Sequence, residues 1–183
     1  MNTIKDWAEY YYDKGLEVYS SDTLLFNLEC KRYSKEHFYS YDWDHSEWIG
    51  CMVGVDKLTI VTLSFDEPDF EYIYIIITRF LWLLGLYRYP WVMWKGNKIF
   101  ILVNCHFQNN HGSQDFGAFS ILWTGFFHLP FIVKSIPTTT YFYFDSIPIS
   151  YPSVIKYDDL WKAIETLIDE FGLFLNKKRA HQE

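Results

Sequence analysis

Two acidic residues directly follow a strongly apolar run of the sequence. The stretch "IVTLSFDE" extends from Ile60 to Glu67 and ends in Asp66 and Glu67. An apolar run of this length is typical of a buried strand, and carboxylates at a strand end are the hard oxygen ligands that Mg²⁺ and Mn²⁺ prefer. The position two residues before Asp66, however, is Ser64. The stretch therefore raises the question whether this chain keeps a catalytic metal site or only its scaffold.

Four basic residues are candidates for contacts to phosphate groups: Lys31, Arg32, Lys95 and Lys98. The tripeptide "GNK" at 96–98 would present a backbone N–H group and an ammonium group to a phosphate, although a hairpin turn with a solvated lysine is the simpler interpretation. Exposed aromatic side chains beside such cations would stack on bases. These residues favour a site for a nucleotide or for single-stranded nucleic acid.

Other residues with metal-binding side chains lack the spacing that a metal site needs. Asp42, Asp44 and His45 lie close together in "YDWDHSEW", but this stretch has neither the glycine nor the distal glutamate of a calcium loop. We interpret these acids as solvated loop residues. The histidines likewise include no set of three ligands at one point.

The composition bounds the classes of function. Among 183 residues the formal net charge is -7 and aromatic residues make up 21%. No basic tail indicates a sequence-independent grip on a phosphate backbone, whereas acidity and abundant tyrosine and tryptophan also suit an interface with a basic protein partner. Three cysteines in no paired spacing indicate neither a disulfide framework nor a zinc site, and they fit a cytoplasmic setting. The most apolar window, residues 72–86, is too short to span a bilayer, so we expect no membrane partner.

The periodicity predicts an α+β domain. Ile4, Trp7, Ala8 and Tyr11 recur at helical spacing and predict a helix over residues 3–14. A strand in "LEVYS", a hairpin over residues 49–65, a helix over about 69–86 and a second hairpin over residues 90–107 follow. Strands at 118–133 and 138–145 then precede an amphipathic helix from Asp158 to about Leu175. This order favours a mixed, mostly antiparallel sheet covered by helices, with residues 1–156 as the domain and 157–183 as a C-terminal helix packed on it plus a short polar tail.

Several segments, taken in order, resemble the N-terminal domain of bifunctional DNA primase-polymerases. The opening "DWAEYYYDKGLEVYS" is similar to the start of that domain, where an amphipathic helix ends in glycine and leads into a short strand. A polar stretch with Lys31 and Lys35 followed by "WIGCMVG" is similar to the family's basic and tryptophan positions before an Ile-Gly pair. "LTIVTLSFDE" lies where the family has a catalytic strand that ends in two acids one residue apart.

Two later segments extend the resemblance to about residues 6–145. "KGNKIFILV" looks like the segment in which a Ser/Gly turn precedes a strand that bears a histidine. "ILWTGFFHLPFIVKSIPTTTYFYF" is similar to the third catalytic segment, which has an acid and a glycine followed by an apolar strand, a proline-rich turn and a strand with tyrosine. The resemblance implies a primase-polymerase-like α+β fold.

The residues that would carry the family's chemistry are mostly replaced. Nucleotidyl transfer to a 3′-hydroxyl needs carboxylates that hold two divalent ions about 4 Å apart. Ser64 and Asp66 stand in place of the two acids, Lys98 stands about where the histidine is expected, and Leu122 falls at the third acid. Asp66, with Glu67 and Asp115 as substitutes, is the remaining candidate set for catalysis and for Mg²⁺ or Mn²⁺. The resemblance therefore implies a degenerate member that keeps the scaffold without the polymerase and requires no cofactor.

Three functions follow as hypotheses. The first is a catalytically degenerate domain that binds nucleotide or nucleic acid, in the replication of a mobile element. The second is an acidic protein-binding module, of the immunity or anti-defence type, that occupies a basic surface on its partner. The third is a residual metal-dependent nucleotidyltransferase that uses Asp66, Glu67 and Asp115.

Overall fold

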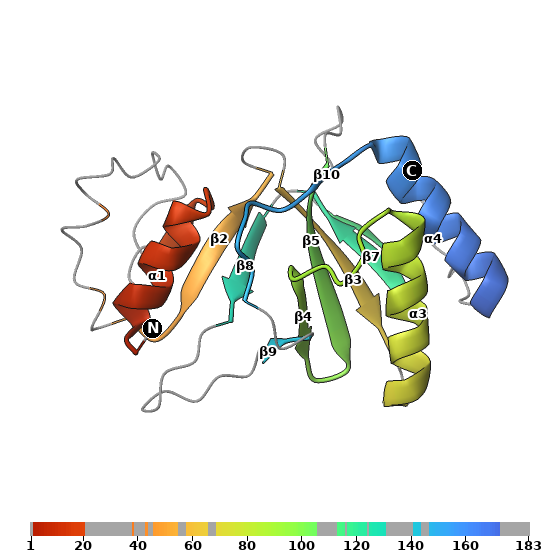
Figure 1. Cartoon of the computed structure of the whole chain (residues 1–183), viewed down its shortest axis with the longest axis horizontal. Helices are drawn as coiled ribbons and strands as arrows, with labels where there is room; N and C mark the ends of the chain where they lie inside the picture. The colour runs from red at the N-terminus through yellow and green to blue at the C-terminus, as the bar shows by residue number, and fades with distance from the viewer. Residues whose placement is uncertain are drawn as a thin grey trace, which may run out of the picture.

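The computed structural model confirms the α+β architecture, and its strands form two sheets that helices cover (Figure 1). It describes residues 2–20, 38, 43, 46–54, 58–65, 69–105, 113–115, 117–123, 125–130, 141–143 and 147–172. Within these residues it contains the helices α1, α3 and α4 and the strands β1 to β10. Their buried side chains form one hydrophobic core.

The larger sheet is built around strand β3 (Leu58–Ser64), whose two edges are both paired with antiparallel neighbours. Strand order in this sheet is β6-β7-β3-β5-β4-β9, and β10 runs parallel to β5. The bounds of the other strands in this sheet are β4 (Val92–Lys95), β5 (Lys98–Cys105), β6 (Ser113–Asp115), β7 (Phe119–Leu122), β9 (Tyr141–Phe142) and β10 (Val154–Ile155). The predicted hairpin over residues 90–107 is confirmed as β4 and β5.

The smaller sheet has the order β1-β2-β8, with all pairs antiparallel. It contains β1 (Val18–Ser20), β2 (Ile49–Val53) and β8 (Gly125–Leu129). The predicted hairpin over residues 49–65 is wrong as a pairing, because β2 and β3 belong to different sheets. Each of these two strands already has neighbours along both of its edges, so the short link between them joins the sheets.

Helix α1 (Ile4–Asp13) begins at a capping box. The Thr3 side chain accepts a hydrogen bond from the Asp6 N–H group at 3.1 Å, and an Asp6 carboxylate oxygen accepts one from the Thr3 N–H group at 3.1 Å. These bonds satisfy N–H groups that have no partner within the helix. Hydrogen bonds from the N–H groups of Asn2 and then of Thr3 lower the pKa of the Asp6 carboxyl group. The apolar stripe predicted from the sequence is buried, from Ile4 to Tyr11.

Helix α3 (Phe70–Leu83) lies on one face of the larger sheet. Asp69 caps its N-terminus by accepting hydrogen bonds from the N–H groups of Glu71 and Tyr72. Its buried residues lie at helical spacing from Ile73 to Leu81, which confirms a helix here. Gly85, with φ +69°, ends it, because glycine adopts the left-handed conformation of a helix C-terminus without steric cost. No helix in the described part of the chain is long and apolar enough to cross a membrane.

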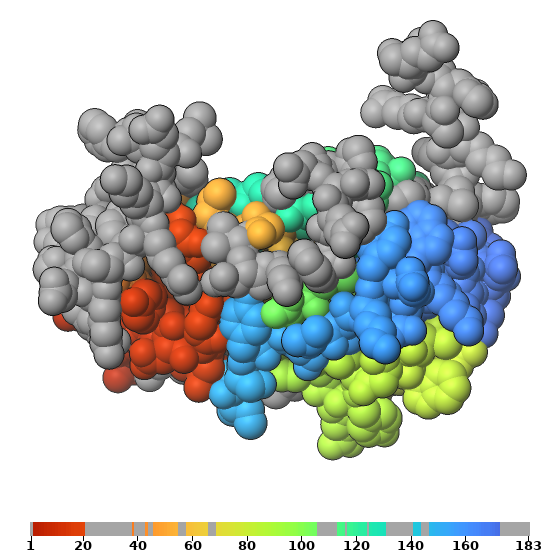
Figure 2. Space-filling view, turned by 90° about the horizontal axis from the view of Figure 1, so that it is seen from above, coloured from red at the N-terminus to blue at the C-terminus, as the bar shows by residue number. Residues whose placement is uncertain are grey.

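Helix α4 (Tyr157–Phe171) packs beside α3. Figures 1 and 2 show these two helices side by side, with α1 at the opposite end of the molecule against the smaller sheet. The prediction that α4 extends to about residue 175 is wrong, because Gly172 has φ +62° and leaves the helical conformation. The Arg79 guanidinium group joins the two helices through the Glu170 carboxylate, with the Arg79 Nε–Glu170 Oε2 distance at 2.8 Å.

Candidate functional site

A cavity of about 270 Å³ lies between the start of α3 and the β4–β5 hairpin. Aromatic and apolar side chains supply most of its lining, and the hairpin turn supplies the polar part. The lining residues are Phe65, Phe70, Ile73, Trp94, Gly96, Asn97, Lys98, Ile99, Phe142 and Tyr143. Its volume is just below the range of about 300–1,000 Å³ that is usual for sites of drug-sized ligands. The cavity is therefore suited to one ring system.

The strand register explains why apolar groups gather there. Ile99 lies directly opposite Leu63 in one ladder and opposite Trp94 in the next, and directly opposed residues share one face of an antiparallel sheet. This face is covered by α3, since the rings of Phe80 and Phe119 are in contact and Phe119 also lies opposite Leu63. The cavity thus occupies the end of the layer between α3 and the larger sheet.

The aromatic side chains differ in how far they reach the solvent. Phe65 and Phe142 are buried, whereas the Phe70 side chain at the first position of α3 is 66% exposed. Trp94 is half-buried, and its ring stacks on Tyr141 at 5.0 Å between centroids. Flat faces at several depths can receive a planar ligand by stacking.

A tight turn positions the polar end of the cavity. Gly96, with φ +59°, occupies the first of the two turn positions between β4 and β5, where a hairpin of type II′ requires glycine. The Asn97 side-chain N–H group donates to the Phe65 carbonyl at 2.8 Å, and the Phe65 N–H group donates to the Asn97 carbonyl at 3.0 Å. The turn is therefore fixed to the end of β3.

Two of the four predicted phosphate-contacting cations come together at this hairpin. Lys95 lies directly opposite Lys98, which lies directly opposite Ser64 in the β3–β5 ladder. Both lysines are exposed. The remaining predicted residues Lys31, Arg32, Asp66 and Glu67 lie outside the described residues.

Asp115 lies on a different strand pair, away from the hairpin. It is opposite Ser120 on β7, which is opposite Thr62 on β3, so its backbone is two strands, or roughly 10 Å, from β3. Its carboxylate accepts a hydrogen bond from the Gly117 N–H group at 2.9 Å. Within the described ranges, no three or more His, Cys, Asp and Glu side chains gather as a metal site would require.

The described thiols and the described histidine lie outside this cavity. Burial raises the pKa of Cys51, and it raises the pKa of Cys105 to about 11. At neutral pH both are therefore thiols, which are poor nucleophiles compared with thiolates. Desolvation and then the charge of Lys95 lower the pKa of His128, whose ring packs at 5.0 Å from that of Trp48.

The aromatic lining was the part of this site that sequence reasoning missed. The sequence showed an excess of aromatic residues, but it did not separate the cavity rings from those of the core. Phe70 lies three residues before Ile73, so its helical spacing aligns it with the buried stripe, although its side chain is 66% exposed. Helical spacing alone therefore could not separate this cavity ring from a ring of the core.

No protein-family model matches this chain, and no curated protein matches it. The resemblance to primase-polymerases therefore stays a prediction from the sequence. Its coarser part, an α+β fold with a mostly antiparallel sheet, is what the structure shows. Any proposal about the function of this chain therefore rests on the geometry of the site.

Proposed function

We propose that this chain binds a nucleotide or single-stranded nucleic acid, with one base in the aromatic cavity and the adjoining phosphate at Lys95 and Lys98. The observation that carries this proposal is that the hairpin turn with Lys98 lines a cavity walled by Phe70, Trp94 and Tyr143, and that Lys95 lies directly opposite Lys98. A planar ring beside a phosphate is the chemistry that such a pair of features recognises.

The expected contributions to the binding free energy are modest. Stacking of a base on an aromatic side chain contributes about 1–3 kcal/mol per base. Two lysine contacts to a single strand predict that the logarithm of affinity falls by about 1.4 for each tenfold rise in salt. With a net charge of -7, the chain as a whole repels a polyanion, so binding depends on this local site.

We propose that the site acts in binding and does not perform nucleotidyl transfer. Ser64 supplies a hydroxyl group where the resemblance places a metal-binding carboxylate, and its neighbour in the ladder is Lys98. An ammonium group at this place repels a divalent cation, whereas it attracts the phosphate that such a cation would hold.

Tryptophan fluorescence tests the proposal directly. The wild-type protein would be titrated at low salt with nucleoside triphosphates and with short single-stranded DNA, with and without Mn²⁺. We expect saturable quenching, which Trp94→Ala removes and Lys98→Ala weakens. Lys162→Ala, which removes an exposed lysine on α4, is the control for the change in net charge.

Two outcomes would count against this function. A flat response of folded protein at low salt would overturn it. Equal weakening by Lys98→Ala and Lys162→Ala would show that the binding is not located at the hairpin.

An exposed apolar stripe on α3 supports a second candidate, the acidic protein-binding module. Tyr72, Ile75 and Trp82 are 39%, 49% and 61% exposed, and their spacing places them along one side of the helix. Tyrosine and tryptophan are common anchors at interfaces. Co-purification of a basic protein with the wild type, and its loss with Trp82→Ala, would favour this candidate over the first.

A further inference from the structure

A second, smaller cavity lies farther along α3, where the loop after the helix folds back on it. Its volume is about 70 Å³, and its lining residues are Tyr74, Thr78, Leu81, Leu86, Tyr87 and Arg88. Together these six side chains carry one positive and no negative charge. The cavity has room for a group of a few heavy atoms and is too small for a base.

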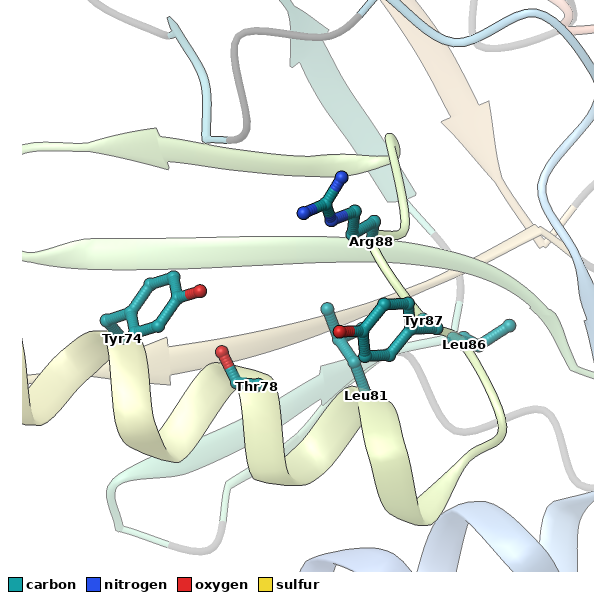
Figure 3. Close-up of a pocket in the computed structure, with 6 residues that line it drawn as sticks. All are labelled: Tyr74, Thr78, Leu81, Leu86, Tyr87 and Arg88. Atoms are coloured by element: carbon teal, nitrogen blue, oxygen red, sulfur yellow. The ribbon is translucent and has the colours of Figure 1, made fainter.

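The polar groups of this cavity converge. Figure 3 shows the hydroxyl groups of Tyr74, Thr78 and Tyr87 pointing into the space between them, with the guanidinium group of Arg88 on the side of the strands. Tyr74 and Thr78 lie one turn apart on α3, whereas Tyr87 and Arg88 come from the loop. Hydroxyl groups from two elements and one cation therefore line the same cavity.

Two of these groups are left without partners in the described part of the chain. The Thr78 hydroxyl is buried and has no hydrogen-bond partner there, although a buried hydroxyl without a partner is costly. Nor does the Arg88 guanidinium group have a hydrogen-bond or ion-pair partner among the described residues. An oxygen-rich anion in the cavity would supply acceptors to all of them.

The backbone of Arg88 supports a role for its side chain. Arg88 has φ +49°, and it is the single non-glycine residue with a positive φ in the described ranges. Glycine or asparagine adopts this conformation at lower cost. An arginine kept in such a conformation is an observation from which function can be inferred, because strain of this kind gathers at ligand sites.

We propose that this cavity binds a phosphate group, with Arg88 as the charged contact and the Tyr74, Thr78 and Tyr87 hydroxyl groups as further donors. Arginine matches phosphate oxygens with two parallel hydrogen bonds. A tetrahedral anion presents acceptors in several directions, which suits donors on opposite walls better than a planar carboxylate does. The site does not depend on the base cavity and stands without it.

Calorimetric titration with inorganic phosphate, in a zwitterionic buffer at constant ionic strength, tests this site. We expect saturable binding to the wild type, a loss of at least tenfold in Arg88→Gly, and about a tenfold loss in Thr78→Val. Arg88→Gly removes the charge and relieves the backbone at the same time, so its melting temperature should equal or exceed that of the wild type. Lys162→Ala is the matched control for the loss of one positive charge.

A second titration with phenyl phosphate identifies the source of the phosphate group. Tighter binding than that of inorganic phosphate would assign the site to a phosphate monoester, and equal binding would assign it to the free ion. The proposal is overturned if chloride at matched ionic strength gives the same heat, or if well-folded Arg88→Gly binds phosphate as the wild type does.

Discussion

The ring of Phe126 lies directly over Gly50. A Cβ atom on Gly50 would be 1.8 Å from the Phe126 Cζ atom, well inside van der Waals contact. Gly50 is in the central strand of the smaller sheet and Phe126 is in the neighbouring strand. The ring is held there by edge-to-face contacts with Trp48 and Tyr19, at 5.1 and 6.2 Å between centroids. The missing side chain of Gly50 is therefore what lets the Phe126 ring approach the sheet so closely.

Gly50→Ala should destabilise the fold by about 1–3 kcal/mol, because the added methyl group forces the Phe126 ring out of its packing. Chemical denaturation of the variant and the wild type measures this difference in the free energy of unfolding. The matched control is Gly50→Ala in a Phe126→Ala background, where the methyl group meets no ring and should cost nothing. Additive effects of the two changes would contradict the contact.

Tyr89→Phe should cost about 1–3 kcal/mol of folding stability. The buried Tyr89 hydroxyl group donates to the Leu102 carbonyl at 2.7 Å and accepts from the Ser153 N–H group at 2.8 Å. Its removal leaves the Leu102 carbonyl in β5 and the Ser153 N–H group just before β10 without this partner. Tyr87→Phe, at a side chain that is 77% exposed, should change stability by less than about 0.5 kcal/mol. Equal effects in the two variants would contradict the prediction.

The contribution of the Arg79–Glu170 ion pair between α3 and α4 to folding stability should depend on pH. The hydrogen bond from Arg79 lowers the pKa of the Glu170 carboxyl group below its ordinary value of 4.5. A carboxyl group with a lowered pKa in the folded state stabilises the fold above its unfolded pKa and loses this effect as the pH falls through the folded value. Glu170→Gln should therefore melt below the wild type at pH 6, and the two curves should converge only as the pH falls below 4.5 and through the lowered pKa of Glu170. A constant difference across this range would contradict the prediction.

Salt dependence should report the number of lysines that contact the phosphate. Between 50 and 200 mM salt, affinity of the wild type for a short single strand should fall about sevenfold for two contacts, and that of Lys98→Ala about two- to threefold for one. Fluorescence titrations at four salt concentrations give these slopes. A Lys98→Ala slope equal to that of the wild type would place the phosphate away from the β4–β5 hairpin.

Local patterns were predicted well where one element buries one face. The stripe from Ile4 to Tyr11 in α1 and the hairpin through Gly96 both depend on short-range periodicity and turn chemistry. The pairing of β2 was predicted wrongly, because each run of residues 49–65 has the alternation of a strand and the link between them has the length of a turn. Alternation of apolar and polar residues shows which side of a strand is buried. It does not show which other strand pairs with it.

By itself the sequence determined the helices, most of the strands and the class of the fold, since these follow from spacing within a few residues. Tertiary structure alone decided the sites. Trp94 and Phe70 meet at one cavity, and Thr78 and Arg88 at another, because α3 packs on a particular face of the larger sheet. The reason is physical: exposure and proximity arise from long-range packing, and an aromatic or basic residue has the same local signature whether it faces the core, the solvent or a ligand.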